Sequence, residues 1–175
     1  MKKCLIVVDY QNDFVSGSLG FTEAAVLENP IAEKIRQYRT AGDEVIFTFD
    51  THEADYLEKQ EGKNLPITHC LRGTTGHELY GQVAELIQPS DKRFYKTTFG
   101  SDELYQYLKS EHFESIELVG VVSNICVISN AVLAKTAQPE TLILVDSSCT
   151  ASNDNDLNQA ALAVMRGLQI QIKAK

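Results

Sequence analysis

The stretch LVGVVSNICVISNAVLAKT, residues 118–136, marks the passage from a buried strand to a helix. An apolar run over residues 116–122 stops at Ser123, and a second run, with helical spacing, begins at Ile125. Cys126 therefore falls in the first turn of the expected helix, where unpaired N–H groups and the positive end of the helix dipole stabilise a thiolate. The alternative is a buried core cysteine, since free cysteine is among the most buried residue types.

Short apolar runs alternate with amphipathic segments along the whole chain. The runs that we interpret as strands are residues 4–9, 44–50, 93–96, 116–122, 141–146 and 168–172. The segments that we interpret as helices are residues 29–42, with Asn29 as cap and Pro30 as first helical residue, and residues 77–87, 101–110, 125–136 and 155–167. This alternation, with strands rich in Val and Ile, predicts an α/β fold of three layers around a mostly parallel, doubly wound sheet. We expect one domain over residues 1–175.

The composition excludes several classes of partner. Sixteen basic against twenty-four acidic side chains give a net charge of -8 with no basic run, so a nucleic-acid partner is not expected. No apolar run reaches membrane-spanning length, and the N-terminus meets Asp9 too early for a signal peptide. The charge balance favours a small polar substrate instead, and no membrane contact is expected. The four cysteines form no CxxC pair, which favours a reducing, cytoplasmic environment.

Chemically active side chains follow the expected strands at their carboxyl ends. The first strand ends at Asp9, the second at Asp50 with His52 just after it, the third at Lys96 and the fourth near Cys126. Each residue taken alone is an ordinary polar strand end. In an open parallel sheet, however, ligands bind beyond the carboxyl ends of the strands, and a nucleophile needs a base and a charge partner nearby. The combination therefore predicts a catalytic site at this edge of the sheet.

These residues lie in motifs whose order resembles that of the isochorismatase-like cysteine hydrolases, and within them the nicotinamidase (pyrazinamidase) branch. The motifs are IVVDYQNDF around Asp9, FTFDTHE around Asp50 and His52, THCLRGTTG around His69, DKRFYKTTFGSDEL around Lys96 and LVGVVSNICV around Cys126. The resemblance runs over essentially the whole chain. It implies a six-stranded sheet of order 3-2-1-4-5-6 and, as in many relatives, a homo-oligomer.

The resemblance implies a catalytic triad of Asp9, Lys96 and Cys126. The expected reaction is hydrolysis of nicotinamide to nicotinate and ammonia through a thioester on the cysteine, a step in NAD salvage (pyridine nucleotide biosynthesis). Asp9 would act as general base, and Lys96 would hold the ionised pair and favour the thiolate by its charge. The resemblance also implies an oxyanion hole made by the backbone N–H groups of Val122 and Cys126, with a cis peptide between Val121 and Val122.

A divalent metal site is the second expected feature. Asp50 and His52 leave a strand two residues apart, so their side chains can point the same way, and His69 returns from the long connection that follows. Glu61 has the spacing after His52 of the glutamate that some nicotinamidases use as fourth ligand. Imidazole and carboxylate ligands with open positions fit Zn, Mn or Fe. We expect the ion to hold the pyridine nitrogen of the substrate, because the cysteine already supplies a nucleophile.

The substrate pocket departs from the usual pattern of the branch. Nicotinamidases usually carry an aromatic residue shortly before the histidine that matches His69, whereas this chain reads NLPITH there. We expect Leu65 to give only apolar contact and Phe14 to supply the aromatic wall, with Val121 as a further substrate contact.

Three alternatives stay open from the sequence. Asp55 or Glu58 of the same loop could replace Glu61 as the fourth ligand. Within the fold, the substrate could be another small amide or a carbamoyl compound. In a different class, the chain could be a redox sensor built on Cys126, although no resolving cysteine lies at a recognisable spacing.

Overall fold

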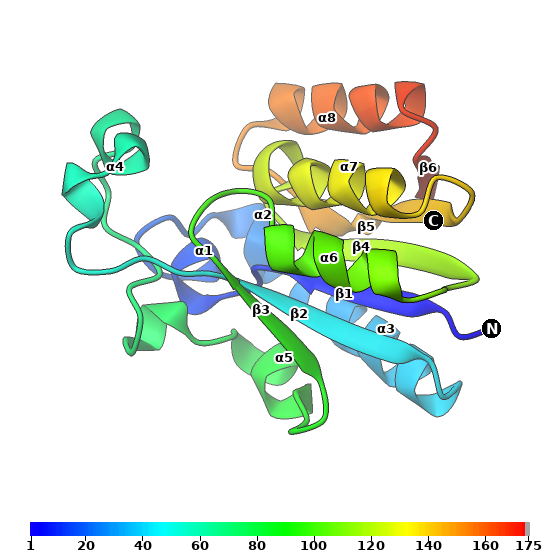
Figure 1. Ribbon diagram of the computed structural model, residues 1–175. Coiled ribbons are helices and arrows are strands. Elements are labelled where there is room, and N and C mark those ends of the chain that lie inside the picture. The colour runs from blue at the N-terminus through cyan, green and yellow to red at the C-terminus, as the bar shows by residue number, and fades with distance from the viewer. Residues whose placement is uncertain (174–175) are drawn as a thin grey trace.

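A parallel sheet runs through the computed structural model, which describes residues 1–173 (Figure 1). Within these residues six strands pair in the order β3-β2-β1-β4-β5-β6, and all the pairings are parallel. The strands are β1 (Cys4–Val8), β2 (Glu44–Asp50), β3 (Lys92–Lys96), β4 (Ser115–Val121), β5 (Leu142–Ala151) and β6 (Gln171–Lys173). The predicted class and strand order are confirmed. The single domain expected over residues 1–175 stays a prediction, and its last two residues lie outside the described range.

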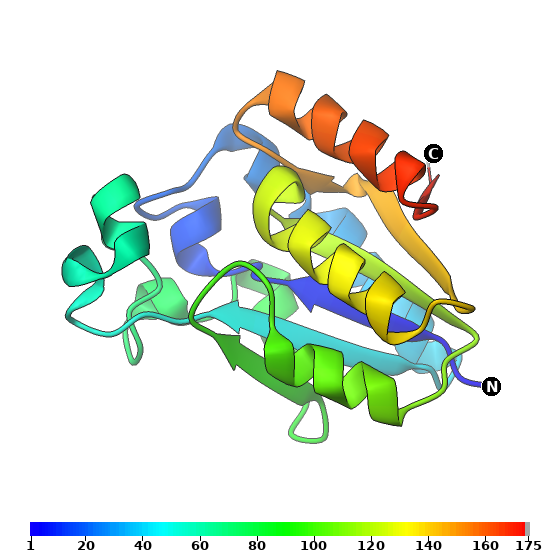
Figure 2. The ribbon, with the colours of Figure 1, turned by 45° about the horizontal axis from the view of Figure 1, so that its top comes forward.

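Helices cover both faces of the sheet (Figures 1 and 2). They are α1 (Asn12–Val15), α2 (Thr22–Ala25), α3 (Glu28–Thr40), α4 (Gln60–Asn64), α5 (Gly81–Leu86), α6 (Asp102–Ser110), α7 (Ile128–Ala137) and α8 (Asn155–Gly167), with short turns η1 (Tyr56–Glu58), η2 (Thr75–His77) and the π-helical η3 (Ser123–Val127). Helices α6, α7 and α8 pack on one face, and α1, α2, α3 and α5 pack on the other. No helix among residues 1–173 is long and apolar enough to cross a membrane.

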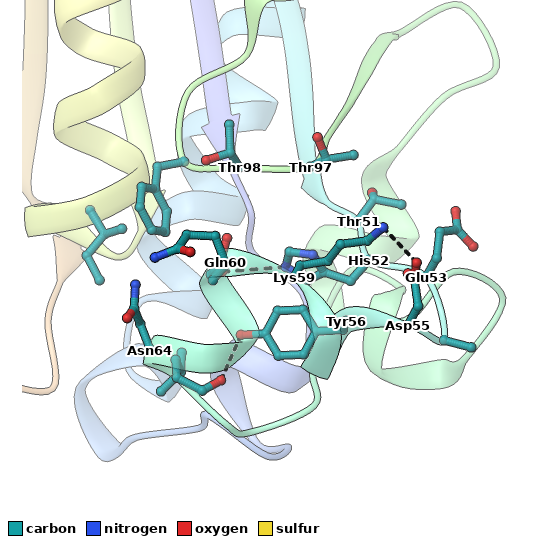
Figure 3. A pocket seen from close by; sticks show the side chains of 15 residues that line it. Thr51, His52, Glu53, Asp55, Tyr56, Lys59, Gln60, Asn64, Thr97 and Thr98 are labelled. Carbon is teal, nitrogen blue, oxygen red and sulfur yellow. Dashed lines mark hydrogen bonds and ion pairs between the residues drawn. The ribbon is translucent and has the colours of Figure 1, made fainter.

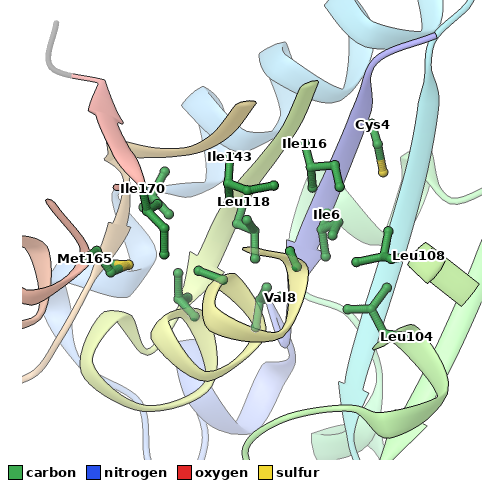
Figure 4. Close-up of a cluster of buried hydrophobic side chains, with 14 of the residues drawn as sticks. Cys4, Ile6, Val8, Leu104, Leu108, Ile116, Leu118, Ile143, Met165 and Ile170 are labelled. Atoms are coloured by element: carbon green, nitrogen blue, oxygen red, sulfur yellow. The ribbon is translucent and has the colours of Figure 1, made fainter. Parts of the chain in front are cut away.

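The core explains why the strands read as continuous apolar runs. In β1 the side chains of Cys4, Ile6 and Val8 point toward α6–α8 (Figure 4), whereas Leu5 and Val7 point toward the other helical layer. All five are fully buried. Because successive side chains of a strand alternate between faces, a strand covered on both sides is apolar at most positions.

The start of α3 differs from the expected cap. The helix begins at Glu28 rather than after Asn29, because Leu27 already has helical dihedrals and continues from α2. The Asn29 side chain instead accepts a hydrogen bond from Gln82 at 2.7 Å. Pro30 then lies in the first turn, where its missing N–H breaks no helical hydrogen bond.

The fifth and sixth strands also differ from their predicted bounds. Strand β5 continues past residue 146 to Ala151, because a bulge in the pairing lets Gly120 of β4 pair with Thr150. Strand β6 is limited to Gln171–Lys173, since α8 and its last turn extend to Leu168. The long connection after β2 carries η1 and α4, which project beyond the carboxyl ends of the strands (Figure 1).

Candidate active site

The structure brings Asp9, Lys96 and Cys126 together at the carboxyl edge of the sheet. The ammonium of Lys96, the last residue of β3, lies 2.6 Å from the Asp9 carboxylate and 3.4 Å from the Cys126 sulfur. It also donates to the Thr98 carbonyl at 3.1 Å, while the Thr48 hydroxyl donates to Asp9 at 2.6 Å. Asp9 follows β1 with φ of 46°, a conformation that is uncommon outside glycine and is frequent at functional sites. All three expected triad side chains are buried.

Cys126 lies in the π-helical turn between β4 and α7. The Val127 N–H donates to the Val122 carbonyl at 3.1 Å, which closes the turn, and π-helical turns are frequent at functional sites. The peptide bond between Val121 and Val122 is cis. From α7, the Asn130 side chain donates to the Cys126 carbonyl at 2.8 Å and fixes the turn from the helix side.

Burial dominates the electrostatics of the three groups. It raises the pKa of the Cys126 thiol well above its usual value, and Lys96 opposes that rise only in part. Burial also raises the pKa of the Asp9 carboxyl against the opposing charge of Lys96. Burial alone would lower the pKa of Lys96, but Asp9 and the neighbouring acidic groups raise it well above the usual value. Desolvation of the sulfur therefore opposes the effect of Lys96, whose charge was expected to favour the thiolate.

Four side chains next to the triad form a set that could hold a metal ion. One ligand atom from each of Asp50, His52, Glu61 and His69 lies within 4.8 Å of all the others. Asp50 Oδ2 is 3.0 Å from His52 Nε2 and 3.3 Å from His69 Nε2. Glu61 Oε1 is 3.7 Å and 3.8 Å from the same two nitrogens. Two imidazoles and two carboxylates converging on one point fit the chemistry of Zn, Mn or Fe.

The other carboxylates of the long connection lie elsewhere. Asp55 pairs with Lys59 at 2.6 Å on the protein surface, and Glu58 is exposed. Among the described residues of this loop, Glu61 is thus the carboxylate that reaches the two histidines.

Asp50 joins the cluster to the triad. Its Oδ1 lies 3.2 Å from the Lys96 ammonium, while Oδ2 faces the two histidines. Although burial would raise the pKa of the Asp50 carboxyl, Lys96 and hydrogen bonds from His52 and His69 hold that pKa well below the usual range. Burial raises the pKa of Glu61, whereas Asp50 raises that of His69 despite its burial. The surroundings therefore favour the ionised form of Asp50 more strongly than that of Glu61.

A cavity of about 1060 Å³ opens beside these groups (Figure 3). Tyr56 and α4 border it on one side and the loop after β3 on the other, and its lining includes His52, Glu61 and the expected contact Leu65. Phe14 packs against His69 with ring centroids 5.5 Å apart, and Val121 is fully buried at the end of β4.

Two apolar residues of the cavity escaped the sequence interpretation. Phe99, 44% exposed, and Ile125, 38% exposed, both line it. The Phe99 carbonyl accepts a hydrogen bond from Asn130, which also binds Cys126, so this ring is anchored to the turn that carries the thiol. An aromatic residue three positions after Lys96 was the available signal, and it places a ring on the cavity wall, whereas the segment before His69 has none.

Comparison with known proteins identifies the family. The sequence profile of the Isochorismatase domain matches residues 3–173. This chain belongs to the isochorismatase family. It is 33% identical over 143 residues to an uncharacterized isochorismatase family protein, PncA, of Bacillus subtilis, covering 75% of this chain and 78% of that one.

Two solved structures of the family have the same fold. The nicotinamidase/pyrazinamidase PncA from Bacillus subtilis superposes with a TM-score of 0.87 at 27% identity, with 100% of both chains covered. The pyrazinamidase of Pyrococcus horikoshii, solved in complex with zinc, gives a TM-score of 0.86 at 22% identity, again with 100% of both chains covered.

Proposed function

We propose that this isochorismatase-family protein is a nicotinamidase, an amidohydrolase that converts nicotinamide to nicotinate and ammonia. One observation carries the proposal: Asp50 lies between Lys96 of the triad and the two histidines of the metal cluster. The cysteine and the metal-binding set are therefore neighbours, and the cavity is lined by His52 and Glu61 of that set and by Ile125, the residue before Cys126. This arrangement suits an amide whose ring carries a metal-binding nitrogen. The nicotinamidase/pyrazinamidase of similar structure supports the same substrate class.

The first half of the proposed reaction forms a thioester. Asp9 takes the proton of the Cys126 thiol, and the sulfur attacks the carboxamide carbon. The raised pKa of the Asp9 carboxyl suits this step, because a stronger base takes a thiol proton more readily. Lys96 stays protonated and offsets the charge that moves between Asp9 and the sulfur. The C–N bond then breaks as Asp9 returns its proton to the nitrogen, and ammonia leaves.

The second half releases the acid. Asp9 takes a proton from water, the hydroxide adds to the thioester carbon, and the C–S bond breaks as Asp9 passes that proton to the Cys126 sulfur. The product acid releases its own proton to solvent and leaves as nicotinate. In both halves negative charge develops on the substrate oxygen. We assign its stabilisation to the backbone N–H groups of Val122 and Cys126, at the turn after β4.

Substrate orientation is assigned to the metal cluster and the cavity walls. Asp50, His52, Glu61 and His69 would hold one Zn, Mn or Fe ion, which when bound supplies an open coordination position for the pyridine nitrogen. Phe99 supplies an aromatic wall of the cavity and Leu65 an apolar one, whereas Phe14 and Val121 lie outside the cavity lining and stay predicted substrate contacts. A cytoplasmic location, a homo-oligomeric state and a place in NAD salvage stay predictions.

Ammonia release from a panel of amides tests the proposal. Nicotinamide and pyrazinamide should be hydrolysed by the metal-loaded protein with kcat/KM at least about a hundredfold above that for N-carbamoyl compounds, because these lack the ring nitrogen. A preference for a carbamoyl compound would show that nicotinamide is not the substrate, and the proposed role of Cys126 as nucleophile would still stand. Absence of hydrolysis of every amide, with reversible oxidation of Cys126, would favour the redox alternative.

A further inference from the structure

Gln11, two residues after Asp9, binds both backbone polar groups of Asp50. Its side-chain oxygen accepts from the Asp50 N–H at 2.8 Å, and its side-chain nitrogen donates to the Asp50 carbonyl at 2.9 Å and to the His77 carbonyl at 2.8 Å. Gln11 is fully buried. A buried amide with these bonds fixes where β2 ends and, with it, where the Asp50 carboxylate lies.

Asp13, two residues after Gln11, binds the backbone next to His69, a ligand on another segment of the metal cluster. Its Oδ2 accepts from the Cys70 N–H at 2.7 Å. Cys70 has φ of 47°, an uncommon conformation for a residue with a side chain, and it directly follows His69. The Cys70 carbonyl accepts from the His52 N–H at 3.0 Å. The backbone that Asp13 binds is therefore also hydrogen-bonded to His52, the other histidine of the cluster.

Two glycines leave room for the Asp13 carboxylate. A Cβ atom on Gly17 would lie 2.3 Å from Asp13 Oδ1, and one on Gly76 would lie 2.1 Å from Asp13 Oδ2. Neither glycine has a positive φ, so the need is for space rather than for backbone freedom. The chain around Asp13 is thus shaped to keep this carboxylate on the Cys70 N–H.

We propose that Gln11 and Asp13 are positioning residues of the metal centre, which hold the backbones of Asp50 and of the residue after His69 at ligand distance. The proposal rests on the metal site of the proposed function. Neither residue faces the ion: each acts through a backbone segment that carries a ligand. The segment 9–13 then carries the catalytic base and also positions two parts of the metal site, the backbone of Asp50 and the backbone next to His69. Groups that orient metal ligands typically affect metal affinity 10- to 100-fold.

Gln11→Leu and Asp13→Ala test the proposal against two matched controls. Gln138 makes the same kind of bonds far from the cluster: its nitrogen donates to the carbonyls of Leu108 and Glu111 at 2.7 and 3.0 Å, and its oxygen accepts from the Phe113 N–H at 3.4 Å. Gln138→Leu is therefore the control for Gln11→Leu. Glu28 accepts from the Gln82 N–H at 2.8 Å beside Gly81, which has φ of 51°, so Glu28→Ala is the control for Asp13→Ala.

The affinity of each full-length, metal-stripped variant for Zn²⁺ is measured by competition with a chromophoric chelator, alongside its melting temperature. We expect Gln11→Leu and Asp13→Ala to bind Zn²⁺ about 10- to 100-fold more weakly than the wild type. The controls should lose similar thermal stability and keep the wild-type affinity. The visible absorption of bound Co²⁺ should change in the two test variants and stay unchanged in the controls.

Gly76→Ala and Gln11→Glu keep the test decisive if a first variant does not fold. The added methyl pushes Asp13 off the Cys70 N–H without removing a polar group, and the glutamate keeps the acceptor for Asp50 while losing the donor. Wild-type Zn²⁺ affinity in the folded variants, or an equal loss in the controls, would overturn the proposal. Weakened Zn²⁺ binding in a protein that leaves nicotinamide intact would instead uphold it and refute the proposed function.

Discussion

Lys96 and Lys34 each lie between two carboxylates: Lys96 is buried, with its side chain 1% exposed, and Lys34 is half-buried, with its side chain 11% exposed. The ammonium of Lys96 lies 2.6 Å from Asp9 and 3.2 Å from Asp50, and that of Lys34, on α3, lies 2.8 Å from Glu117 and 2.6 Å from Asp146. In both clusters the carboxylates raise the pKa of the lysine against the effect of burial. Charge and burial alone therefore do not distinguish an active site from an internal ionic network.

The neighbours of the two clusters make the difference. Around Lys34, the Tyr38 hydroxyl donates to Glu117 at 2.6 Å and Ser148 donates twice to Asp146, at 2.9 and 2.6 Å. These partners satisfy the carboxylates and join α3 to β4 and β5. Around Lys96 lies a thiol instead, and the cluster borders two histidines and a cavity. The Lys96 cluster thus differs from the Lys34 cluster by having a nucleophile and a cavity beside it, and these are the features of a catalytic site.

Removal of the thiol should give the largest difference between the clusters. Cys126→Ala should lower kcat for nicotinamide by about four orders of magnitude or more, because the other residues cannot form the thioester. Cys4→Ala is the control, since Cys4 is also buried and its pKa is also raised by burial, yet it begins β1 at the other end of the strand. Ammonia release measures both. Appreciable turnover by Cys126→Ala would show that another group is the nucleophile.

Replacement of each lysine should separate catalysis from stability. Lys96→Met should lower kcat/KM at least about a thousandfold, because Asp9 and the sulfur lose their shared cation. Lys34→Met should leave kcat/KM of the folded protein unchanged and lower the free energy of unfolding by about 3–5 kcal/mol, the usual cost of breaking a buried ion pair. Urea unfolding and steady-state kinetics on both variants check this. An equal loss of activity in the two would contradict the distinction drawn here.

Metal removal should affect the Lys96 cluster alone. Chelation should lower nicotinamide hydrolysis about a hundredfold, since an orientation effect of this size is lost with the ligand for the ring nitrogen. Iodoacetamide labelling of Cys126, followed by mass spectrometry, should stay close to that of the metal-loaded protein, because the thiol and Asp9 remain in place. His52→Ala and His69→Ala should reproduce the chelated state. Full hydrolysis by metal-free protein would show that the metal has no role in the reaction.

The sequence predicts the sheet well where burial is two-sided. Strand β1 is apolar at all five positions, and β4 is apolar from Leu118 to Val121, so these runs stand out. The second half of β5 was missed because residues 146–151 are mostly polar and join the sheet only through the bulge opposite Gly120. Gly120 has φ of 110° and approaches Val8 so closely that a Cβ would lie 2.1 Å from its carbonyl oxygen. Such a tertiary fit leaves no periodic signal.

The site also contains residues that a sequence pattern identifies and residues whose roles depend on contacts between distant parts of the chain. The predicted triad and the predicted ligands Asp50 and His52 could be named because they lie at or just after strand ends, in a characteristic order of motifs. Glu61 and His69 were named from their motif and spacing alone, and the structure brings them next to the other two ligands. Gln11 and Asp13 belong to the first motif, but their roles were hidden, because their partners Asp50 and Cys70 lie 39 and 57 residues further along the chain. The electrostatics of Cys126 show the same limit: helix position and a nearby lysine can be read from sequence, whereas the desolvation that raises the pKa of the thiol requires the fold.

The pH dependence of the Lys34 cluster gives the smallest expected effect. Although burial would raise it, Lys34 and Ser148 lower the pKa of the Asp146 carboxyl below its usual range. A folded-state pKa below the unfolded value of about 3.9 means that Asp146 stabilises the fold above that pH, and that this contribution is lost as the pH falls through the folded pKa. Asp146→Asn should therefore be less stable than the wild type at pH 7, by about 2 kcal/mol, and the difference should vanish in strong acid. Urea unfolding of both proteins between pH 7 and pH 3 measures it. A difference that stays constant across this range would mean that packing, not charge, sets the contribution of Asp146, and the likeness between the two lysine clusters would then be one of geometry alone.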